Sequence, residues 1–215
     1  MTPEVPYGEV CRYLGYRGGA RPDAETERLI EELSGRIREA ASPRYACARL
    51  PLALGEDGGV SLGNIAVRSA ALRRNLDGCR GCYLFAATLG AEVDRLISRA
   101  SARRVSEAAI CDAAASALIE AVCDGLNERL REEALAEGLY LRPRFSPGYG
   151  DFSIEHQRDI VRVLNTPVRL GLTVTEGLML APAKSVTAVI GISGSPRPHE
   201  RGCGGCEKDN CGFRR

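Results

Sequence analysis

The chain has 215 residues, of which 44% are hydrophobic and 27% charged, so it is long enough to bury one proper core. Its 29 basic and 28 acidic residues nearly balance, which leaves no excess positive charge to hold a nucleic-acid backbone. Aromatic residues make up only 5%, and this argues against a base-stacking surface. No apolar run reaches the ~20 residues of a membrane helix, and the first residues lack a signal-peptide pattern. We therefore expect a soluble, cytoplasmic protein with no nucleic-acid or membrane partner.

Apolar patterns indicate several helices and strands before residue 105. After Asp23, an apolar stripe with helical spacing predicts a helix that ends near Ser42 and packs on a sheet. The apolar run Cys79–Leu89 is typical of a strand buried on both faces. A strand directs Cys79 and Cys82 to opposite faces, which favours core packing over a redox pair. The other elements expected here are a strand over Tyr45–Leu54, a short helix over Ser69–Leu76 and a helix that starts at Gly90.

The second half of the chain begins with the longest expected helix. Residues from about Val105 to Glu137 are rich in Ala, Leu and Glu, and small residues surround Glu120, where a carboxylate needs a partner. Prolines and glycines in residues 139–153 predict a shaped loop. A short helix over Ile154–Leu164 is expected next, and then two strand-like runs, Leu170–Leu180 and Ser185–Ile192, close enough in sequence to pair antiparallel.

The order of these elements predicts the fold class. Helices interspersed with strands, and a late antiparallel pair, favour an α+β fold over a repeating parallel unit. We expect a twisted, mainly antiparallel sheet flanked by helices, with one long Ala-rich helix. Residues 1–195 are expected to form one domain, and residues 196–215 a Cys-rich C-terminal tail.

The most informative segment for chemistry is the loop from Arg144 to Asp151. Glycines at 148 and 150 let main-chain amides approach a ligand, and a Pro-Gly pair favours a tight turn. Arg144 adds a planar, permanently charged fork suited to a carboxylate, and Tyr149 offers a flat apolar face with a polar tip. A surface turn with a salt-bridged arginine is the alternative interpretation.

The tail carries a second group of candidate residues. The chain has nine cysteines, an odd number, and no export signal, which favours free thiols over a disulfide framework. Cys203, Cys206 and Cys211 have short, glycine-rich spacing and can converge on one metal, either zinc with His199 as a fourth ligand or an iron–sulfur cluster. Redox-active or disulfide-forming thiols, and a mobile tail whose cysteines bind no metal, are the alternatives.

Three groups of residues match a known family. The loop reads Arg-x-x-Pro-Gly-Tyr; residues 172–186 resemble a downstream segment of the form L-T-E-S, M-x-P, S-V-S; and Glu120, Asp124 and Glu128 repeat a helical spacing of acidic residues. With these matches, the chain resembles the activation (reactivation) domain of cobalamin-dependent methionine synthase, in its stand-alone form. The resemblance covers roughly residues 105–192.

The resemblance implies a function and roles for individual residues. It implies an activation subunit that binds S-adenosylmethionine and supports reductive remethylation of cobalamin held by a partner, a corrinoid-binding methyltransferase subunit such as methionine synthase. Flavodoxin or another electron donor is a further implied partner. Arg144 would grip the methionine carboxylate, and the loop residues Phe145, Ser146, Pro147, Gly148 and Tyr149 would line the pocket. Glu120 and Tyr149 are the implied catalytic residues, although Glu120 as a surface or helix-pairing carboxylate is an alternative.

Two other functions fit the sequence. The first is a metal-bearing or iron–sulfur redox adaptor, which passes an electron to a corrinoid protein through the tail cysteines and does not bind S-adenosylmethionine itself. The second is a binding module that only clamps the corrinoid domain in one conformation. Hydrolysis is not indicated, because no Ser/His/Asp arrangement is evident in the sequence and the chain has only two histidines.

Overall fold

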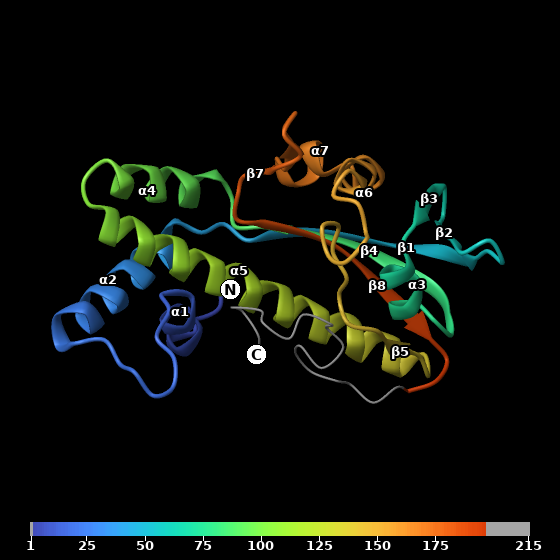
Figure 1. Ribbon diagram of the computed structural model, residues 1–215, viewed down its shortest axis with the longest axis horizontal. Coiled ribbons are helices and arrows are strands. Elements are labelled where there is room, and N and C mark those ends of the chain that lie inside the picture. The colour runs from blue at the N-terminus through green and yellow to red at the C-terminus, as the bar shows by residue number, and fades with distance from the viewer. Residues whose placement is uncertain (1, 197–215) are drawn as a thin grey trace.

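In the computed structural model, which describes residues 2–196, the chain folds around an antiparallel sheet with helices on both faces (Figure 1). The helices are α1 (Tyr7–Tyr13), α2 (Ala24–Ala40), α3 (Ala70–Asn75), α4 (Ala91–Ser101), α5 (Val105–Ala136), α6 (His156–Leu164) and α7 (Thr166–Leu170). The strands are β1 (Arg44–Leu54), β2 (Gly59–Leu62), β3 (Ile65–Arg68), β4 (Cys79–Thr88), β5 (Tyr140–Leu141), β6 (Thr173–Val174), β7 (Leu180–Ala181) and β8 (Ser185–Ser193). The α+β class and the long helix are as the sequence predicts.

The sheet has six strands in the order β3-β2-β1-β4-β8-β5, and each pair of neighbours is antiparallel. The long strand β4 lies at its centre, where Phe85 faces Cys47 of β1 on one side and Ala188 of β8 on the other. Phe85 is fully buried. The apolar run Cys79–Leu89 is therefore a central strand, as predicted.

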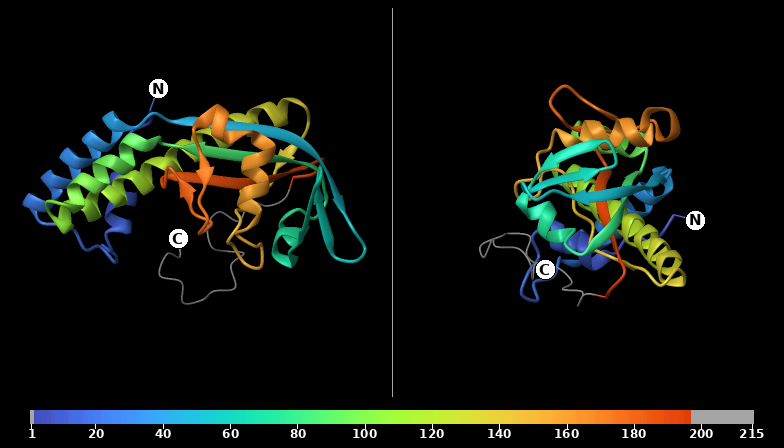
Figure 2. Two further views of the ribbon diagram at one scale, coloured as in Figure 1. Left: turned by 90° about the horizontal axis from the view of Figure 1, so that it is seen from above. Right: turned by 90° about the vertical axis from the view of Figure 1, so that its right-hand side faces the viewer.

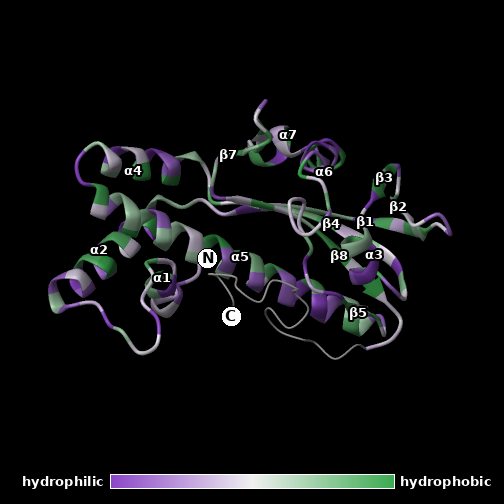
Figure 3. Ribbon diagram, in the orientation of Figure 1, coloured by the Kyte–Doolittle hydropathy of each residue, from purple (hydrophilic) through white to green (hydrophobic). Residues whose placement is uncertain are grey.

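Two apolar cores cover the two faces of this sheet. Side chains alternate between the faces of a strand, and in β4 Tyr83, Phe85 and Ala87 join the core under α5, whereas Leu84 and Ala86 join the core under α6. Leu72 of α3 and Ile160 of α6 belong to the second core. In Figure 3 the covering helices show alternating bands of polar and apolar colour, as expected of elements with one face on a core.

The helix α5 runs the length of the first core. At 32 residues it extends about 48 Å, and its buried face includes a run of alanines, which lets neighbouring backbones approach closely. Figures 1 and 2 place α1, α2 and α4 beside its first half and the sheet beside its second half. The prediction that α2 packs on a sheet is wrong, because α2 packs mainly against α5 and α4.

The segment after α6 also differs from expectation. Leu170–Leu180 is not one strand: α7 ends at Leu170, and Gly171 follows in the left-handed region with a φ of 66°. Only the two-residue strands β6 and β7 pair in this segment, whereas β8 pairs with β4 and β5. The run is apolar because Leu170 and Leu172 fill the second core, and not because it forms a ladder.

Cys79 and Cys82 lie at an irregular start of β4. The register shifts between Cys79 and Gly81, and a Cβ placed on Gly191, the residue opposite Cys82, would lie 2.6 Å from the Cys79 sulfur. The bulge thus turns Cys79 toward the face that Cys82 occupies, where a regular strand would separate the two. Cys82 is fully buried, and burial raises the pKa of its thiol to about 12. The prediction that the strand separates the two cysteines is therefore wrong, whereas the predicted core packing is confirmed for Cys82.

Among residues 2–196, no helix combines the length and the apolar character that crossing a bilayer requires.

Candidate functional site

The Arg144 loop, residues 142–152, joins β5 to the segment before α6 and lies along β8. The main-chain N–H of Phe145 donates to the carbonyl of Val189, and that of Val189 donates back, each at 2.9 Å. The main-chain N–H of Arg142 donates to the carbonyl of Gly191 at 2.8 Å. These bonds extend the sheet edge beyond β5 and fix the direction in which Arg144 leaves the strand.

A tight turn follows at Pro147 and Gly148, as the sequence predicts. The N–H of Tyr149 donates to the carbonyl of Ser146 at 3.1 Å, and the N–H of Gly148 donates to the carbonyl of Phe152 at 2.8 Å. Gly148 has a φ of 94°, which is in the region that only glycine adopts readily. The loop is therefore closed by its own backbone bonds.

Arg144 reaches across to α5. Its Nη2 donates to Glu120 Oε2 at 3.0 Å and to Asp124 Oδ1 at 2.9 Å. The two acidic residues stand four positions apart, on one face of the helix. The Arg144 side chain is only 17% exposed, whereas Glu120 is 35% and Asp124 66% exposed. The cluster therefore joins a largely buried guanidinium to carboxylates that open toward solvent.

Aromatic rings form a row behind the turn. The centroid of Phe145 lies 6.3 Å from that of Tyr149 and 6.3 Å from that of Phe152, and Phe152 stacks on His156 at 5.4 Å. Phe152 is buried, but Tyr149 is 63% exposed. His156 Nδ1 pairs with Asp159 Oδ2 at 2.9 Å. These ring contacts pack the loop against α6, and they leave the Tyr149 side chain largely exposed.

The structure brings together most of the site residues that the sequence suggests. Glu120 and Arg144 are in direct contact, and Phe145, Ser146, Pro147, Gly148 and Tyr149 all belong to the same loop. Asp124 is the second carboxylate that pairs with Arg144. Its spacing of four positions from Glu120 in the sequence already indicates that the two carboxylates share one face of the helix. The predicted metal ligands Cys203, Cys206 and Cys211, and His199 beside them, lie outside the described residues, so their metal site stays a prediction.

Asp151 makes a contact beside this site that sequence reasoning missed. Its carboxylate accepts hydrogen bonds from the Ser69 hydroxyl at 2.6 Å and from the main-chain N–H groups of Ala70 and Ala71 at 2.7 and 3.0 Å. These three bonds lower its pKa to about 2. No local pattern predicts the contact, because Ser69 lies 82 residues earlier in the chain.

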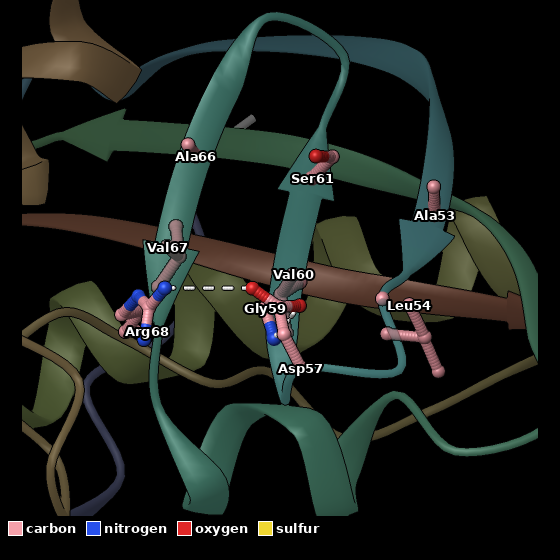
Figure 4. A pocket seen from close by; sticks show the side chains of 10 residues that line it. Ala53, Leu54, Asp57, Gly59, Val60, Ser61, Ala66, Val67 and Arg68 are labelled. Carbon is pink, nitrogen blue, oxygen red and sulfur yellow. Dashed lines mark hydrogen bonds and ion pairs between the residues drawn. The ribbon is translucent and has the colours of Figure 1, made fainter.

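A separate concavity among the described residues lies away from this loop. It is an open hollow of about 520 Å³ on the β1–β2–β3 face (Figure 4). Small side chains such as Ala53, Ser61 and Ala66 line it, and the exposed ion pair of Asp57 and Arg68, at 3.4 Å, stands at its margin. None of the predicted site residues lines this hollow.

Comparison with known proteins identifies the family. A sequence profile described as the activation domain of vitamin B12 dependent methionine synthase matches residues 80–213, well over half of the chain. The chain belongs to this family. The match begins at the start of β4, includes α5 and the Arg144 loop, and continues into the tail.

A solved structure supports the fold of this activation domain. The crystal structure of the MetH reactivation domain bound to AdoHcy aligns with a TM-score of 0.60 at 18% identity, over 81% of this chain and 67% of that one. At this identity the likeness establishes the fold. Among curated proteins, none matches the chain.

Proposed function

We propose that this activation domain binds S-adenosylmethionine at the Arg144 loop and supports reductive remethylation of cobalamin held by a corrinoid-binding methyltransferase subunit. The observation that carries the proposal is the cluster of Arg144 with Glu120 and Asp124 beside a closed, glycine-containing turn. Family membership supplies the cobalamin context. When bound, S-adenosylmethionine supplies the methyl group, and a separate reductant, such as flavodoxin, supplies the electron.

The charges of the cluster suit the amino-acid end of this ligand. S-adenosylmethionine carries one carboxylate next to an ammonium and a sulfonium group. One guanidinium and two carboxylates complement that set, because the ligand carboxylate pairs with Arg144 and the cationic groups pair with Glu120 and Asp124. Without ligand, the protein groups neutralise one another. Binding thus exchanges two ion pairs within the chain for ion pairs with the ligand.

The remaining loop residues have supporting roles in this proposal. Phe145 to Gly148 provide the main-chain wall of the pocket, since the turn is closed by bonds from Tyr149 to Ser146 and from Gly148 to Phe152. Tyr149 presents its exposed ring to the ligand or to the corrinoid partner. Glu120 keeps a carboxylate at the edge of the site and is the residue we assign to proton handling near the reacting centre.

Calorimetric titration of S-adenosylmethionine tests the proposal. Arg144→Ala should weaken binding by about 10- to 100-fold, which corresponds to the loss of one or two charge-assisted hydrogen bonds. Arg49→Ala is the control, because Arg49 also forms an ion pair, with the carboxylate of Glu137 at 2.8 Å. Glu137 follows Asp124 by 13 positions, or about 20 Å along a helix. The control should bind like the wild type.

Two results would overturn the proposal. If the wild type fails to bind S-adenosylmethionine both alone and with a cobalamin-loaded methyltransferase subunit, the ligand is wrong. If Arg144→Ala binds as tightly as the wild type, the ligand lies elsewhere. Arg144→Lys separates charge from geometry, since lysine keeps the positive charge but not the planar fork; we expect it to recover only part of the affinity.

A further inference from the structure

The short helix α3 is held at both ends by charged residues of the Arg144 loop. At its start, the Asp151 carboxylate accepts hydrogen bonds from the Ser69 hydroxyl and from the N–H groups of Ala70 and Ala71. Beyond its end, Arg142 Nη2 donates to the carbonyl of Asp77 at 3.3 Å. An anion at the start and a cation near the end of a helix are the favourable placements for its dipole.

The loop also contacts α3 between these two anchors. A Cβ placed on Gly150 would lie 2.8 Å from the Cβ of Ala71, so the backbone of the loop passes directly over the first turn of the helix. Gly150 has a φ of 57°, which glycine adopts without strain. Asn75 Nδ2 donates to the carbonyl of Pro143 at 3.4 Å. The loop therefore follows α3 from one end to the other.

The Arg142 anchor is buried and carries its charge without an acidic partner among the described residues. Its side chain is 4% exposed, Nη2 also donates to Ser193 Oγ at 3.1 Å, and Nε has no hydrogen-bond partner in the described part of the chain. Because the Arg142 side chain is packed in the interior and donates two hydrogen bonds, the start of the loop can move only if the surrounding side chains repack. Asp151, in contrast, is exposed, so its contact is the one that can open.

We propose that Asp151 is a positioning residue for the Arg144 loop, which it holds against α3 in the conformation that presents Arg144 to the ligand. The inference rests on the proposed function, because the ligand is the one assigned there. Asp151 lies seven residues after Arg144 and touches neither it nor its acidic partners by any described contact. Asp151 therefore affects binding through the loop. By ordering the loop before the ligand arrives, it lowers the entropic cost of binding.

Charge and topology both favour this role. Because its pKa is lowered to about 2, Asp151 is anionic throughout the neutral range and its three hydrogen bonds persist there. The contact also joins two parts of the chain that differ in the family comparison. The match to the family begins at residue 80, so Asp151 lies within it, whereas α3 lies before it. The segment before residue 80 thus contributes to the site as a support.

Three variants test this role. Asp151→Ala removes all three bonds and should weaken S-adenosylmethionine binding by about tenfold. Asp151→Asn keeps one acceptor oxygen for Ser69 and Ala71 but turns an amide toward Ala70, so it should recover most of the loss. The matched control is Asp23→Ala, which also removes a carboxylate from a helix start, where it accepts from the N–H of Thr26 at 2.8 Å, but in α2. The control should leave affinity unchanged.

Hydrogen exchange of the unliganded protein separates this inference from the proposed function. The amides of Gly148 and Phe152, which close the turn, should exchange faster in Asp151→Ala than in the wild type or in Asp23→Ala. Unchanged exchange of these amides, or unchanged affinity in Asp151→Ala, would overturn the positioning role. A wild type that binds no S-adenosylmethionine while loop exchange still responds to Asp151→Ala would overturn the proposed function and with it the role in binding.

Discussion

Replacing Gly191 with alanine should destabilise the protein, because three side chains already occupy the space that the new methyl group needs. The added Cβ would lie 2.6 Å from the sulfur of Cys79, 2.8 Å from Cδ2 of Leu76 and 3.0 Å from Cγ of Arg142. Carbon atoms in contact normally stay about 3.5–4.0 Å apart. The three neighbours come from β4, from the end of α3 and from the start of the Arg144 loop, so no single movement relieves all three.

The expected cost follows from this overlap. Overpacking a well-filled site by one methyl group costs about 1–3 kcal/mol in free energy of unfolding. For a chain of this size, each kcal/mol lowers Tm by about 2–4 °C, so the variant should melt roughly 2–12 °C lower. Since the Gly191 carbonyl accepts from the N–H of Arg142 at 2.8 Å, displacement of this strand also displaces the base of the Arg144 loop.

Urea unfolding of four variants checks the argument. Gly194→Ala is the control, because no atom lies within 4 Å of its added Cβ, and it should change stability by less than about 0.5 kcal/mol. Cys79→Ala removes the closest atom, so Gly191→Ala should cost at least about 0.5 kcal/mol less in the Cys79→Ala background than in the wild type. The reasoning is refuted if Gly191→Ala is no more destabilising than Gly194→Ala, or if its cost does not depend on Cys79.

Three further predictions concern single side chains. Lys184→Met keeps the apolar stem but loses the contact of Nζ with Asp112 at 2.8 Å, so it should lower the free energy of unfolding by about 1 kcal/mol in urea titration; an unchanged midpoint would contradict this. The pKa of Asp151 is lowered in the folded state, so the stability that its carboxylate contributes is complete above the ordinary Asp pKa of 3.8 and is lost as pH falls through about 2. The difference in Tm between wild type and Asp151→Ala should therefore be constant from neutral pH to about pH 4 and shrink below it; a difference that shrinks already near pH 6 would refute the cause given. Burial raises the pKa of Cys82 to about 12, so iodoacetamide at about pH 8 should alkylate Cys82 only after unfolding, and rapid labelling of the native protein would show that this thiol is accessible.

Elements with long, regular patterns could be predicted from the sequence, and short ones could not. The length and Ala- and Leu-rich composition of α5 and the apolar run of β4 are visible in the sequence because many side chains of both elements are buried. The β2–β3 hairpin was missed although Gly63-Asn64 separates its two strands, which is a recognised two-residue turn signal. The short helices α1 and α7 carry too few residues for a period to be visible.

The same distinction applies to the site. The turn at Pro147-Gly148 is a local property of its residues, so the sequence predicts it directly. The pairing of Arg144 with Glu120 spans 24 positions, and the sequence indicates only that the Glu120 carboxylate needs a partner, not which residue supplies it. The contact of Asp151 with Ser69 joins an exposed residue to a buried one, and their neighbours in the sequence carry no shared pattern. Such a contact becomes visible only when the fold has brought α3 beneath the loop.

Because α5 is one continuous helix, its length determines where Glu120 and Asp124 lie relative to the helices packed around its start. The same helix is packed among α1, α2 and α4 at one end and carries Glu120 and Asp124 farther along. One residue inserted between these two parts would rotate everything after it by about 100°, and would carry both carboxylates away from Arg144. Seven inserted residues would nearly restore the direction but move the carboxylates about 10 Å along the axis. The length of α5 therefore fixes the distance between the helices α1, α2 and α4 and the Arg144 loop. Insertions and deletions that preserve the contacts of Arg144 have to lie outside α5.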